Sequence, residues 1–447
     1  MSMKQKAVYT YAWDFLDEGV DVVLERIKKA GGREVIVAMA YHAGRFLLPH
    51  NPKRRIYYPE DGVVYFKADK ARYAGQRLKP LVASIYGNSK DGRARRPCRA
   101  VRGGAAHPEG SPYRSEAGKV ATMRVTRSGP NSILGGRDLM GEIIEKAKKL
   151  GISVTAWFVC FHNSRLGFLH PGVVARNAFG DPYYHYLCPM NQDASGYVLN
   201  LLDDFTSRYA CDGVFLESLS YSGFGHGYHH EFYGVTINAE LSALLGLCFC
   251  EACRRAAEKG NIDVERLAAS VRKRIDTCVG KGDDKKNATP VRVLESIGKL
   301  CGMNDFLRMR CERVGRLLEQ TAQITRERKM RLDFFGPVFA PVKMSLLEGV
   351  DLAVVNKKAD RYVLPIEEKN PALVENEIRY AKQFFNPEKI VLSLRLLERA
   401  TSSQRNLKAK AELAERHGLA GCNFYNYGMV PLDRLNWLTS KGQEIAR

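Results

Sequence analysis

A single carboxylate closes a short apolar run near the middle of the sequence. The run Val214–Leu216 leads directly into Glu217, and glycines, aromatic residues and histidines follow it. The same loop contains His226, His229 and a second carboxylate, Glu231. Burial raises the pKa of a carboxyl group until it can act as an acid, and imidazoles bind ligands or transfer protons. The stretch therefore predicts acid–base chemistry centred on Glu217.

The elements that must position these residues alternate along the chain. Eight apolar runs of strand length recur, separated by amphipathic helices that end near glycine or proline. The predicted strands are Ala7–Ala12, Val35–Ala40, Ser153–Val159, Gly213–Leu216, Leu332–Phe335, Leu352–Val355, Ile390–Leu394 and Cys422–Tyr425. Such alternation indicates parallel β/α units, and eight units close a barrel of about 250 residues. We therefore predict an α/β fold of the (β/α)8 TIM-barrel type rather than an open doubly wound sheet, because no glycine-rich phosphate fingerprint follows the first strand.

Two segments exceed a minimal barrel. Residues 45–135 contain a predicted β-hairpin with Asp61 and Gly62 as its turn, followed by a basic run rich in glycine, proline and arginine. That run has too few large apolar residues to pack by itself, which favours a mobile loop. Residues 222–330, after the fourth strand, are predicted to form a mostly helical insertion. The chain, residues 1–447, is therefore expected to be one barrel domain with two insertions.

The composition favours a globular protein with a large core over a membrane protein or a disulfide-rich one. Hydrophobic residues make up 45% of the 447 residues, which is ample for a large core. No run approaches the roughly 20 apolar residues that cross a bilayer, and the N-terminus has no signal-like apolar segment, so we expect a cytoplasmic protein without a membrane partner. The eleven scattered cysteines fit reduced, buried thiols better than a disulfide framework. The net charge of +20 favours anionic partners, but without a nucleic-acid motif we do not expect nucleic acid to be one of them.

In a (β/α)8 barrel the strand ends and the loops after them form one active-site mouth, so the polar residues there are informative. Glu217 is the expected catalytic carboxylate. Asp14, which also suits the start of the first helix, and Glu231 are the candidates for a second one. The candidate substrate-binding residues are Tyr41, His42, Arg45, Trp157, His162, Asn163, His226, His229, Arg395, Tyr425, Asn426 and Tyr427.

This set of side chains suits a carbohydrate. Aromatic rings stack on the apolar faces of sugars, and a pair of carboxylates is what cleavage of a glycosidic bond needs. The sequence therefore favours a glycoside hydrolase that uses no cofactor and acts on an oligo- or polysaccharide; the positive charge would suit an acidic one. Two other interpretations stay open. One is a carbohydrate-binding barrel without catalysis, and the other is a metal-dependent lyase or isomerase with His226, His229 and Glu231 as ligands.

Three cysteines at C-x-C-x2-C spacing need a separate interpretation. They are Cys248, Cys250 and Cys253. A nearby histidine would complete a tetrahedral metal site, but no second C-x2-C follows at the spacing of structural zinc sites. The segment also continues smoothly into a helix. Buried thiols are therefore the favoured interpretation here, and a metal is the alternative.

Several motifs are similar to those of a known group of proteins. The most specific is the segment GDPYYHYLCPMN, followed by a helix and then YACDGVFLE; the others are YHAGRFLLPHNP, WFVCFHNSRLG, LGLCFCEACRR and GCNFYNYGMVP. With these motifs the chain resembles bacterial glycoside-hydrolase-like TIM barrels, a group that includes glycosyl hydrolases and α-amylase-family proteins. The resemblance implies a retaining or inverting hydrolase of carbohydrates, and it maps the acid after strand four onto Glu217.

The second carboxylate departs from the patterns of that group. Barrels of the β-galactosidase type carry the nucleophile on strand seven, where this chain has Ser393 and Arg395. Barrels of the α-amylase type carry an acid after strand five, where this chain has FFGPVFAP. Under either pattern Glu231 or Asp14 would have to take the place of the missing carboxylate.

Overall fold

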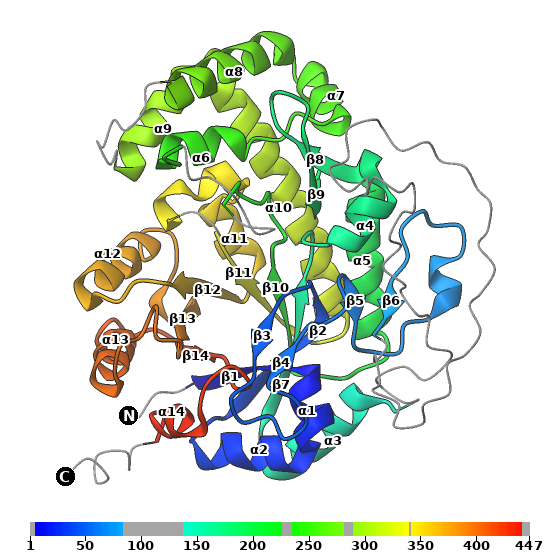
Figure 1. The fold of residues 1–447 in the computed structure, drawn as a ribbon, viewed down its shortest axis with the longest axis vertical. Coiled ribbons are helices and arrows are strands. Elements are labelled where there is room, and N and C mark those ends of the chain that lie inside the picture. The colour runs from blue at the N-terminus through cyan, green and yellow to red at the C-terminus, as the bar shows by residue number, and fades with distance from the viewer. Residues whose placement is uncertain (1–4, 84–136, 226–234, 281–288, 339–340, 440–447) are drawn as a thin grey trace, which may run out of the picture. The chain divides into compact units, whose positions relative to one another are not determined.

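The computed structural model describes residues 5–83, 137–225, 235–280, 289–338 and 341–439 (Figure 1). The basic run of the first insertion lies outside these residues. So does the loop that carries His226, His229 and Glu231. No helix in the described ranges is long and apolar enough to cross a membrane.

Eight parallel strands form a closed barrel. They are β1 (Gln5–Tyr11), β2 (Glu34–Tyr41), β7 (Ser153–Val159), β10 (Gly213–Glu217), β11 (Arg331–Phe335), β12 (Arg361–Ile366), β13 (Ile390–Arg395) and β14 (Gly421–Tyr425). The hydrogen-bonded order is β1-β14-β13-β12-β11-β10-β7-β2, and pairing of β1 with β2 closes the ring. Figure 1 shows helices around the outside of the strands. Strands covered on both faces are buried along nearly their whole length, which is why they appear in the sequence as continuous apolar runs. The predicted (β/α)8 fold is confirmed.

The prediction of the sixth strand was wrong. Leu352–Val355 lies in the helix α11 (Leu352–Lys358), whose N-cap Asp351 accepts hydrogen bonds from two backbone N–H groups. A four-residue apolar run has no periodicity that separates a strand from a buried helix turn. The true sixth strand, β12, begins a few residues later and leads into Glu367. This shift changes which carboxylate reaches the barrel mouth.

The barrel helices show why these segments fold where they do. In α3 (Leu139–Leu150) the side chain of Asp138 caps the first turn by accepting from the Gly141 N–H. Ile143 and Ala147, one turn apart, are buried against the barrel. Gly151 ends the helix with a positive φ of 68°, which favours glycine. The other helices of the outer layer are α1 (Ala12–Glu18), α2 (Val20–Lys29), α5 (Gln192–Thr206), α10 (Met303–Glu327), α11, α12 (Pro371–Ala381), α13 (Gln404–Arg416) and α14 (Leu432–Asn436).

The described part of the first insertion consists of short strands and one turn of helix. The strands β3 (Phe46–Leu47) and β4 (Ile56–Tyr57) pair with each other. The strand β5 (Val63–Val64) instead pairs with β2 and with β6 (Leu81–Val82), and η1 (Lys70–Tyr73) lies between β5 and β6. The two runs that flank Asp61 and Gly62 therefore do not pair with each other, so the hairpin predicted there was wrong.

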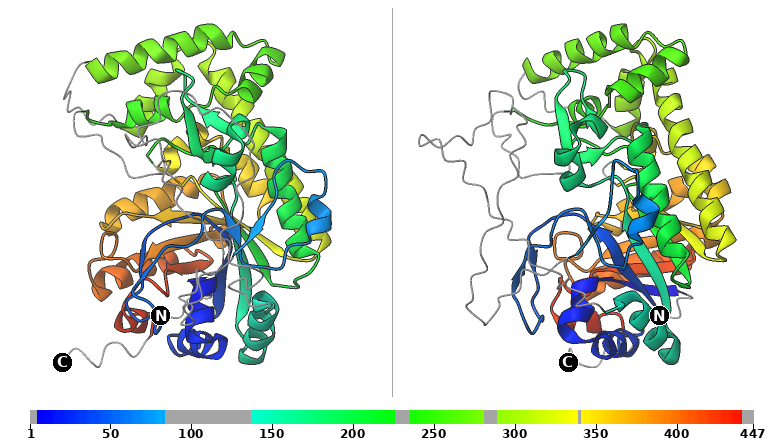
Figure 2. Two further views of the ribbon diagram at one scale, coloured as in Figure 1. Left: turned by 45° about the vertical axis from the view of Figure 1, so that its right-hand side comes forward. Right: turned by 90° about the vertical axis from the view of Figure 1, so that its right-hand side faces the viewer.

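Two further groups of elements extend the loops after β7 and β10. After β7 come α4 (Ser164–Leu169), η2 (Pro171–Val173) and a hairpin of β8 (Val174–Arg176) with β9 (Pro182–Leu187). After β10 come α6 (Ala239–Leu245), α7 (Glu251–Lys259), α8 (Val264–Gly280) and α9 (Pro290–Gly298). These helices share a core of their own in which Phe249 stacks on Phe306 of α10 at 5.1 Å. Both views of Figure 2 show them gathered on one side of the barrel.

Candidate active site

The carboxyl ends of the barrel strands surround a cavity of about 360 Å³, which we call the mouth cavity. Six of its lining residues are each the last residue of a barrel strand: Tyr41, Glu217, Phe335, Ile366, Arg395 and Tyr425. The remaining lining residues are Tyr9, His42, Phe46, Trp157, Val338, Pro365, Glu367, Ser393 and Arg399. Parallel strands thus bring side chains from distant parts of the sequence to one place.

Glu217 is the carboxylate that ends β10. The indole N–H of Trp157 donates a hydrogen bond of 2.8 Å to its Oε2. Burial raises the pKa of Glu217 to about 7, although the nearby Arg395 guanidinium and the Trp157 hydrogen bond both act to lower it. A carboxyl group with this pKa is partly protonated at neutral pH and can therefore donate a proton.

Glu367 is a second carboxylate at the same cavity, and the sequence analysis missed it. It follows the last residue of β12 and forms an ion pair with Arg395. Its negative charge contributes to the raised pKa of Glu217. Arg395 in turn lies over the ring of Tyr425, with its Cζ 5.0 Å from the ring centroid. One guanidinium therefore interacts electrostatically with both carboxylates and with an aromatic wall of the cavity.

Aromatic rings form much of the cavity lining and hold one another in place. Trp157 packs edge-on against Tyr9 at 5.4 Å and against Tyr41 at 5.0 Å. The hydroxyl of Tyr11, behind the lining, is 3.1 Å from that of Tyr41 and 2.6 Å from that of Tyr425. The result is a set of interlocked flat apolar faces with polar edges, which can stack on the apolar face of a ring-shaped ligand and bind its polar groups.

His42 brings an imidazole to the rim of the cavity. Its ring stacks on Tyr41 at 4.4 Å and on His162 at 4.2 Å. Burial lowers the pKa of His42 to about 4, so the ring is neutral at pH 7 and serves as a hydrogen-bonding group rather than a cation. His162 does not line the cavity itself and instead supports His42 from behind.

The structure places two other predicted residues outside the cavity lining. Asp14 lies in the first turn of α1, where its Oδ2 accepts a 2.8 Å hydrogen bond from the Tyr11 N–H. Burial raises the pKa of this carboxyl group well above its usual range. Arg45 is exposed and does not line the cavity. Glu231, His226 and His229 lie outside the described residues.

Three polar residues that were predicted to bind substrate form hydrogen bonds within the protein instead. Asn163 is the N-cap of α4 and accepts from a backbone N–H through its side chain. Asn426 accepts a 2.9 Å hydrogen bond from the Gly428 N–H. The hydroxyl of Tyr427 donates to Glu18 at 2.9 Å. None of the three lines the mouth cavity, although each follows a barrel strand.

Two residues of the cavity lining were not predicted from the sequence, although the alternation of side chains along the strands points to them. Tyr9 lies two residues before the end of β1, and Ser393 lies two residues before the end of β13. Side chains alternate between the two faces of a strand, so the second residue back from the mouth also points inward. The Tyr9 hydroxyl and Ser393 Oγ are 3.1 Å apart, which connects the two strands across the base of the cavity.

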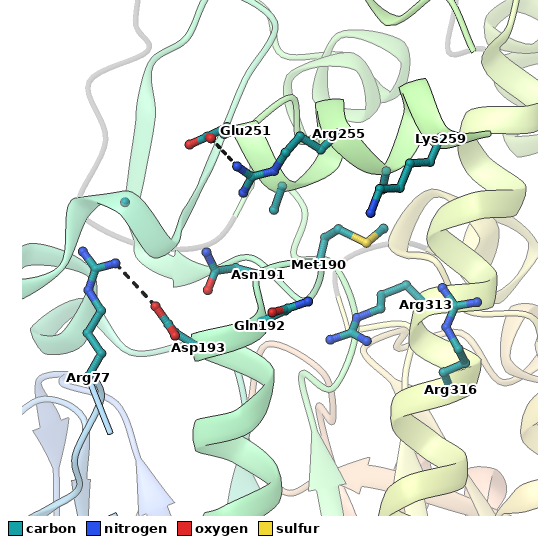
Figure 3. A pocket seen from close by; sticks show the side chains of 13 residues that line it. Arg77, Met190, Asn191, Gln192, Asp193, Glu251, Arg255, Lys259, Arg313 and Arg316 are labelled. Carbon is teal, nitrogen blue, oxygen red and sulfur yellow. Dashed lines mark hydrogen bonds and ion pairs between the residues drawn. The ribbon is translucent and has the colours of Figure 1, made fainter. Parts of the chain in front are cut away.

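A second cavity, of about 630 Å³, lies between α5, α7 and α10 (Figure 3). We call it the cationic cleft; it is lined by Arg77, Gly172, Met190, Asn191, Gln192, Asp193, Glu251, Ala252, Arg255, Ala256, Lys259, Arg313 and Arg316. Its two carboxylates are paired, Asp193 with Arg77 at 3.4 Å and Glu251 with Arg255. The cleft therefore lacks a carboxyl group placed for acid–base work, and the mouth cavity is the candidate active site.

Solved structures with the same fold include glycoside hydrolases. The PgaB (BpsB) glycoside hydrolase domain from Bordetella bronchiseptica matches with a TM-score of 0.52 and 11% identity over 94% of this chain and 93% of that domain. Alpha-L-fucosidase isoenzyme 2 from Paenibacillus thiaminolyticus matches with a TM-score of 0.50 and 11% identity over 98% of this chain, which spans 48% of the fucosidase. No protein-family model and no curated protein sequence matches the chain. At this level of identity the likeness establishes the fold, as the resemblance of the motifs implied.

Proposed function

We propose that this protein is a glycoside hydrolase in which Glu217 is the general acid. The observation that carries the proposal is the position and state of this carboxylate. It ends the fourth barrel strand, lies in a cavity lined by aromatic rings, and has its pKa raised by burial to about 7. A pKa near the working pH is what a proton donor to a glycosidic oxygen needs.

In this proposal Glu367 is the second carboxylate. Cleavage of a glycosidic bond needs one carboxyl group that protonates the leaving oxygen and one carboxylate that attacks the anomeric carbon or activates water. Glu367 lines the same cavity as Glu217 and forms an ion pair with Arg395. It thus replaces Asp14 and Glu231, the two residues suggested by the sequence for this role.

The remaining lining residues would bind an oligo- or polysaccharide. Trp157, Tyr41 and Tyr425 offer flat faces for sugar rings, and the neutral His42 offers a hydrogen bond to a hydroxyl group. Arg399, which is 3.4 Å from Glu367, adds a second cation at the rim. Together with the net charge of +20, these arginines favour a glycan that carries acidic groups.

The aromatic lining would also suit a barrel that binds carbohydrate without cleaving it. The raised pKa of Glu217 supports the hydrolase, because binding alone needs no carboxyl group poised near neutral pH. We therefore favour the hydrolase. The metal-dependent alternative depends on His226, His229 and Glu231, which lie outside the described residues.

The test compares Glu217→Gln and Glu367→Gln on a panel of aryl glycosides and oligosaccharides, neutral and acidic. Glu217→Gln is expected to lower turnover of substrates with poor leaving groups by about 10²–10⁴-fold, the usual contribution of general acid catalysis. Dinitrophenyl glycosides leave without protonation, so the same variant should lose far less activity on them. Glu367→Gln should be impaired on both classes of substrate, because its role does not depend on the leaving group.

Glu368→Gln is the matched control, since Glu368 is adjacent, exposed and absent from the cavity lining. It should retain full activity. Turnover that survives Glu217→Gln on every substrate would refute the assignment of the acid. Glycan binding by the wild-type protein without any turnover would favour the non-catalytic barrel instead.

A further inference from the structure

Three neighbouring cysteines and a fourth that is distant in the sequence meet at one buried point. Cys188 follows β9, and Cys248, Cys250 and Cys253 lie at the start of α7. Their sulfur atoms all lie within 4.8 Å of one another, and all four residues are buried. None of the cysteines in the described ranges forms a disulfide.

We propose that these four cysteines bind one Zn²⁺ ion as thiolates. In a tetrahedral site of four thiolates with Zn–S bonds of about 2.3 Å, neighbouring sulfurs are about 3.8 Å apart. The Sγ atoms of Cys188 and Cys248 are 3.8 Å apart, and those of Cys188 and Cys253 are 3.5 Å apart. Both distances fit the edges of such a tetrahedron, and both are far longer than the roughly 2.05 Å of a disulfide bond. Four soft thiolate ligands in this arrangement select zinc over the hard ions that prefer oxygen.

Backbone hydrogen bonds hold the segment that carries three of the cysteines in place. The backbone N–H of Arg176, at the end of β8, donates to the Cys248 sulfur at 3.5 Å. The next residue along the chain, Phe249, donates its N–H to the Arg176 carbonyl at 2.7 Å. These two backbone bonds fix the start of α7 against the β8–β9 hairpin. Groups that hold the ligands in this way tune the affinity of a metal site.

A buried arginine, separated from the cluster by Tyr221, would offset the negative charge of such a centre. Four thiolates around Zn²⁺ carry a net charge of −2. Arg310 is fully buried, and none of its three guanidinium nitrogens has a hydrogen-bond partner among the described residues. Its Cζ lies 4.1 Å from the centroid of the Tyr221 ring, and the Tyr221 hydroxyl is 3.9 Å from the Cys253 sulfur. An uncompensated buried charge is costly, and a dianionic zinc centre on the other side of Tyr221 would compensate it.

The expected role of the ion is to attach the helical insertion to the barrel. Cys188 lies in the short connection between β9 and α5 of the barrel layer, whereas the other three ligands belong to the insertion. Arg310 lies on α10, which packs against both α5 and α7. With four protein ligands there is no open position for a substrate, so the site is structural rather than catalytic.

The first test is elemental analysis of the full-length protein purified without added metal. We expect one zinc per chain, released when a mercurial reagent modifies the thiols. Replacement by Co²⁺ should give the sulfur-to-cobalt charge transfer in the near ultraviolet and the red d–d bands of a tetrahedral thiolate site. Neither measurement needs a variant that folds.

Variants then assign the ligands. Cys188→Ser and Cys253→Ser should each lose the metal, while Cys211→Ser, which removes a buried thiol outside the cluster, should retain it. Arg310→Met should keep the tetrahedral cobalt spectrum but release zinc to a chelator at least about tenfold faster, in line with other residues that support metal ligands. Arg310→Lys should restore much of the retention, because the charge rather than the shape is required.

Two results would overturn the proposal. One is a folded wild-type protein with four free thiols and no bound metal after reconstitution with Zn²⁺. The other is a Cys188–Cys253 disulfide, visible as a loss of two hydrogens in the mass of the unreduced protein. Activity of the mouth cavity does not enter either readout, so the zinc site and the glycosidase proposal can fail separately.

Discussion

The mouth cavity and the cationic cleft differ in what surrounds their charges. The cleft is the larger, about 630 Å³ against 360 Å³, and holds more charged side chains. Yet its ion pairs are solvated: Arg77 and Asp193 are 51% and 45% exposed, and Arg255 and Glu251 are 62% and 79% exposed. Pairs of this kind contribute about 0–1 kcal/mol, and water screens their effect on neighbouring groups. Size and charge are therefore not the features that single out the proposed active site.

In the mouth cavity, aromatic rings replace water around one of the two carboxylates, Glu217. Trp157 and the rings packed against it desolvate Glu217, and this desolvation outweighs the opposing effects of Arg395 and of the indole hydrogen bond. A charge in such surroundings is sensitive to each neighbour, whereas a solvated charge is not.

The largest contrast is expected for the removal of an arginine. Arg395→Met takes away the partner of Glu367 and the cation that opposes the rise in the pKa of Glu217. We expect kcat/KM to fall by about 10²–10³-fold, as for the loss of one preorganised electrostatic group. Arg316→Met removes the same side chain from the cleft and should change kcat/KM by less than about twofold. Equal losses in steady-state assays would contradict the distinction between the two regions.

The next contrast is the pH dependence of stability. The pKa of Glu217 is about 7 in the folded protein and near 4.5 when unfolded, so the unfolded state ionises first as the pH rises. The contribution of Glu217 to the stability of the wild type is thus greatest below pH 4.5 and is progressively lost as the pH rises to 7. Glu217→Gln cannot ionise, so at pH 8 its free energy of unfolding should exceed that of the wild type by on the order of 3 kcal/mol.

Urea unfolding at pH 4.5 and pH 8 checks this expectation. Glu251→Gln, in the cleft, is the control, because its solvated carboxylate should give no such pH-dependent difference. A Glu217→Gln protein that is less stable than the wild type at pH 8 would mean that the ionised carboxylate is well solvated, contrary to the role assigned to it.

Seven of the eight barrel strands, the barrel itself and the position of Glu217 at its mouth could be predicted from the sequence, because they depend on local pattern and on one topological rule. A run such as Val214–Leu216 is apolar because both faces of the strand are covered, and a parallel barrel brings every strand end to the same mouth. Glu367 was missed for a local reason. Leu352–Val355 is as apolar as a strand, so it hid the true sixth strand, Arg361–Ile366, and the carboxylate after it.

Other parts of the site depend on contacts that no local pattern contains. Asn163 and Asn426 follow barrel strands as expected, but their side chains cap backbone N–H groups instead of facing the cavity. This competition between capping and ligand binding is decided by the loop conformation. Cys188 likewise lies far in sequence from the C-x-C-x2-C motif, and only the fold brings it to Cys253. Because Cys188 follows a separate hairpin, the number of residues between it and the motif is not fixed, so a search for a spaced motif would not find it.

A smaller effect should follow the loss of one hydrogen bond in the mouth cavity. Trp157→Phe keeps a ring against Tyr9 and Tyr41 but removes the donor to Glu217. This hydrogen bond lowers the pKa of the carboxyl group, so its loss should raise the pKa further. The alkaline limb of the pH profile of kcat/KM should move upward by about one unit. A shift downward would show that the indole stabilises the protonated form instead.

The smallest effect is expected in the cationic cleft. Lys259→Gln combined with Arg316→Gln should leave turnover of a small aryl glycoside unchanged, because neither residue lines the mouth cavity. It should weaken binding of an anionic polysaccharide such as heparin by about three- to tenfold at low salt, with the difference vanishing as salt screens the charges.

The control, Lys28→Gln with Lys29→Gln on α2, lowers the net charge equally at an exposed site elsewhere. If the control weakens heparin binding as much as the cleft variant does, attraction comes from the net charge of +20 as a whole. The cleft would then be only the space between three helices, and the mouth cavity alone would account for recognition of a glycan.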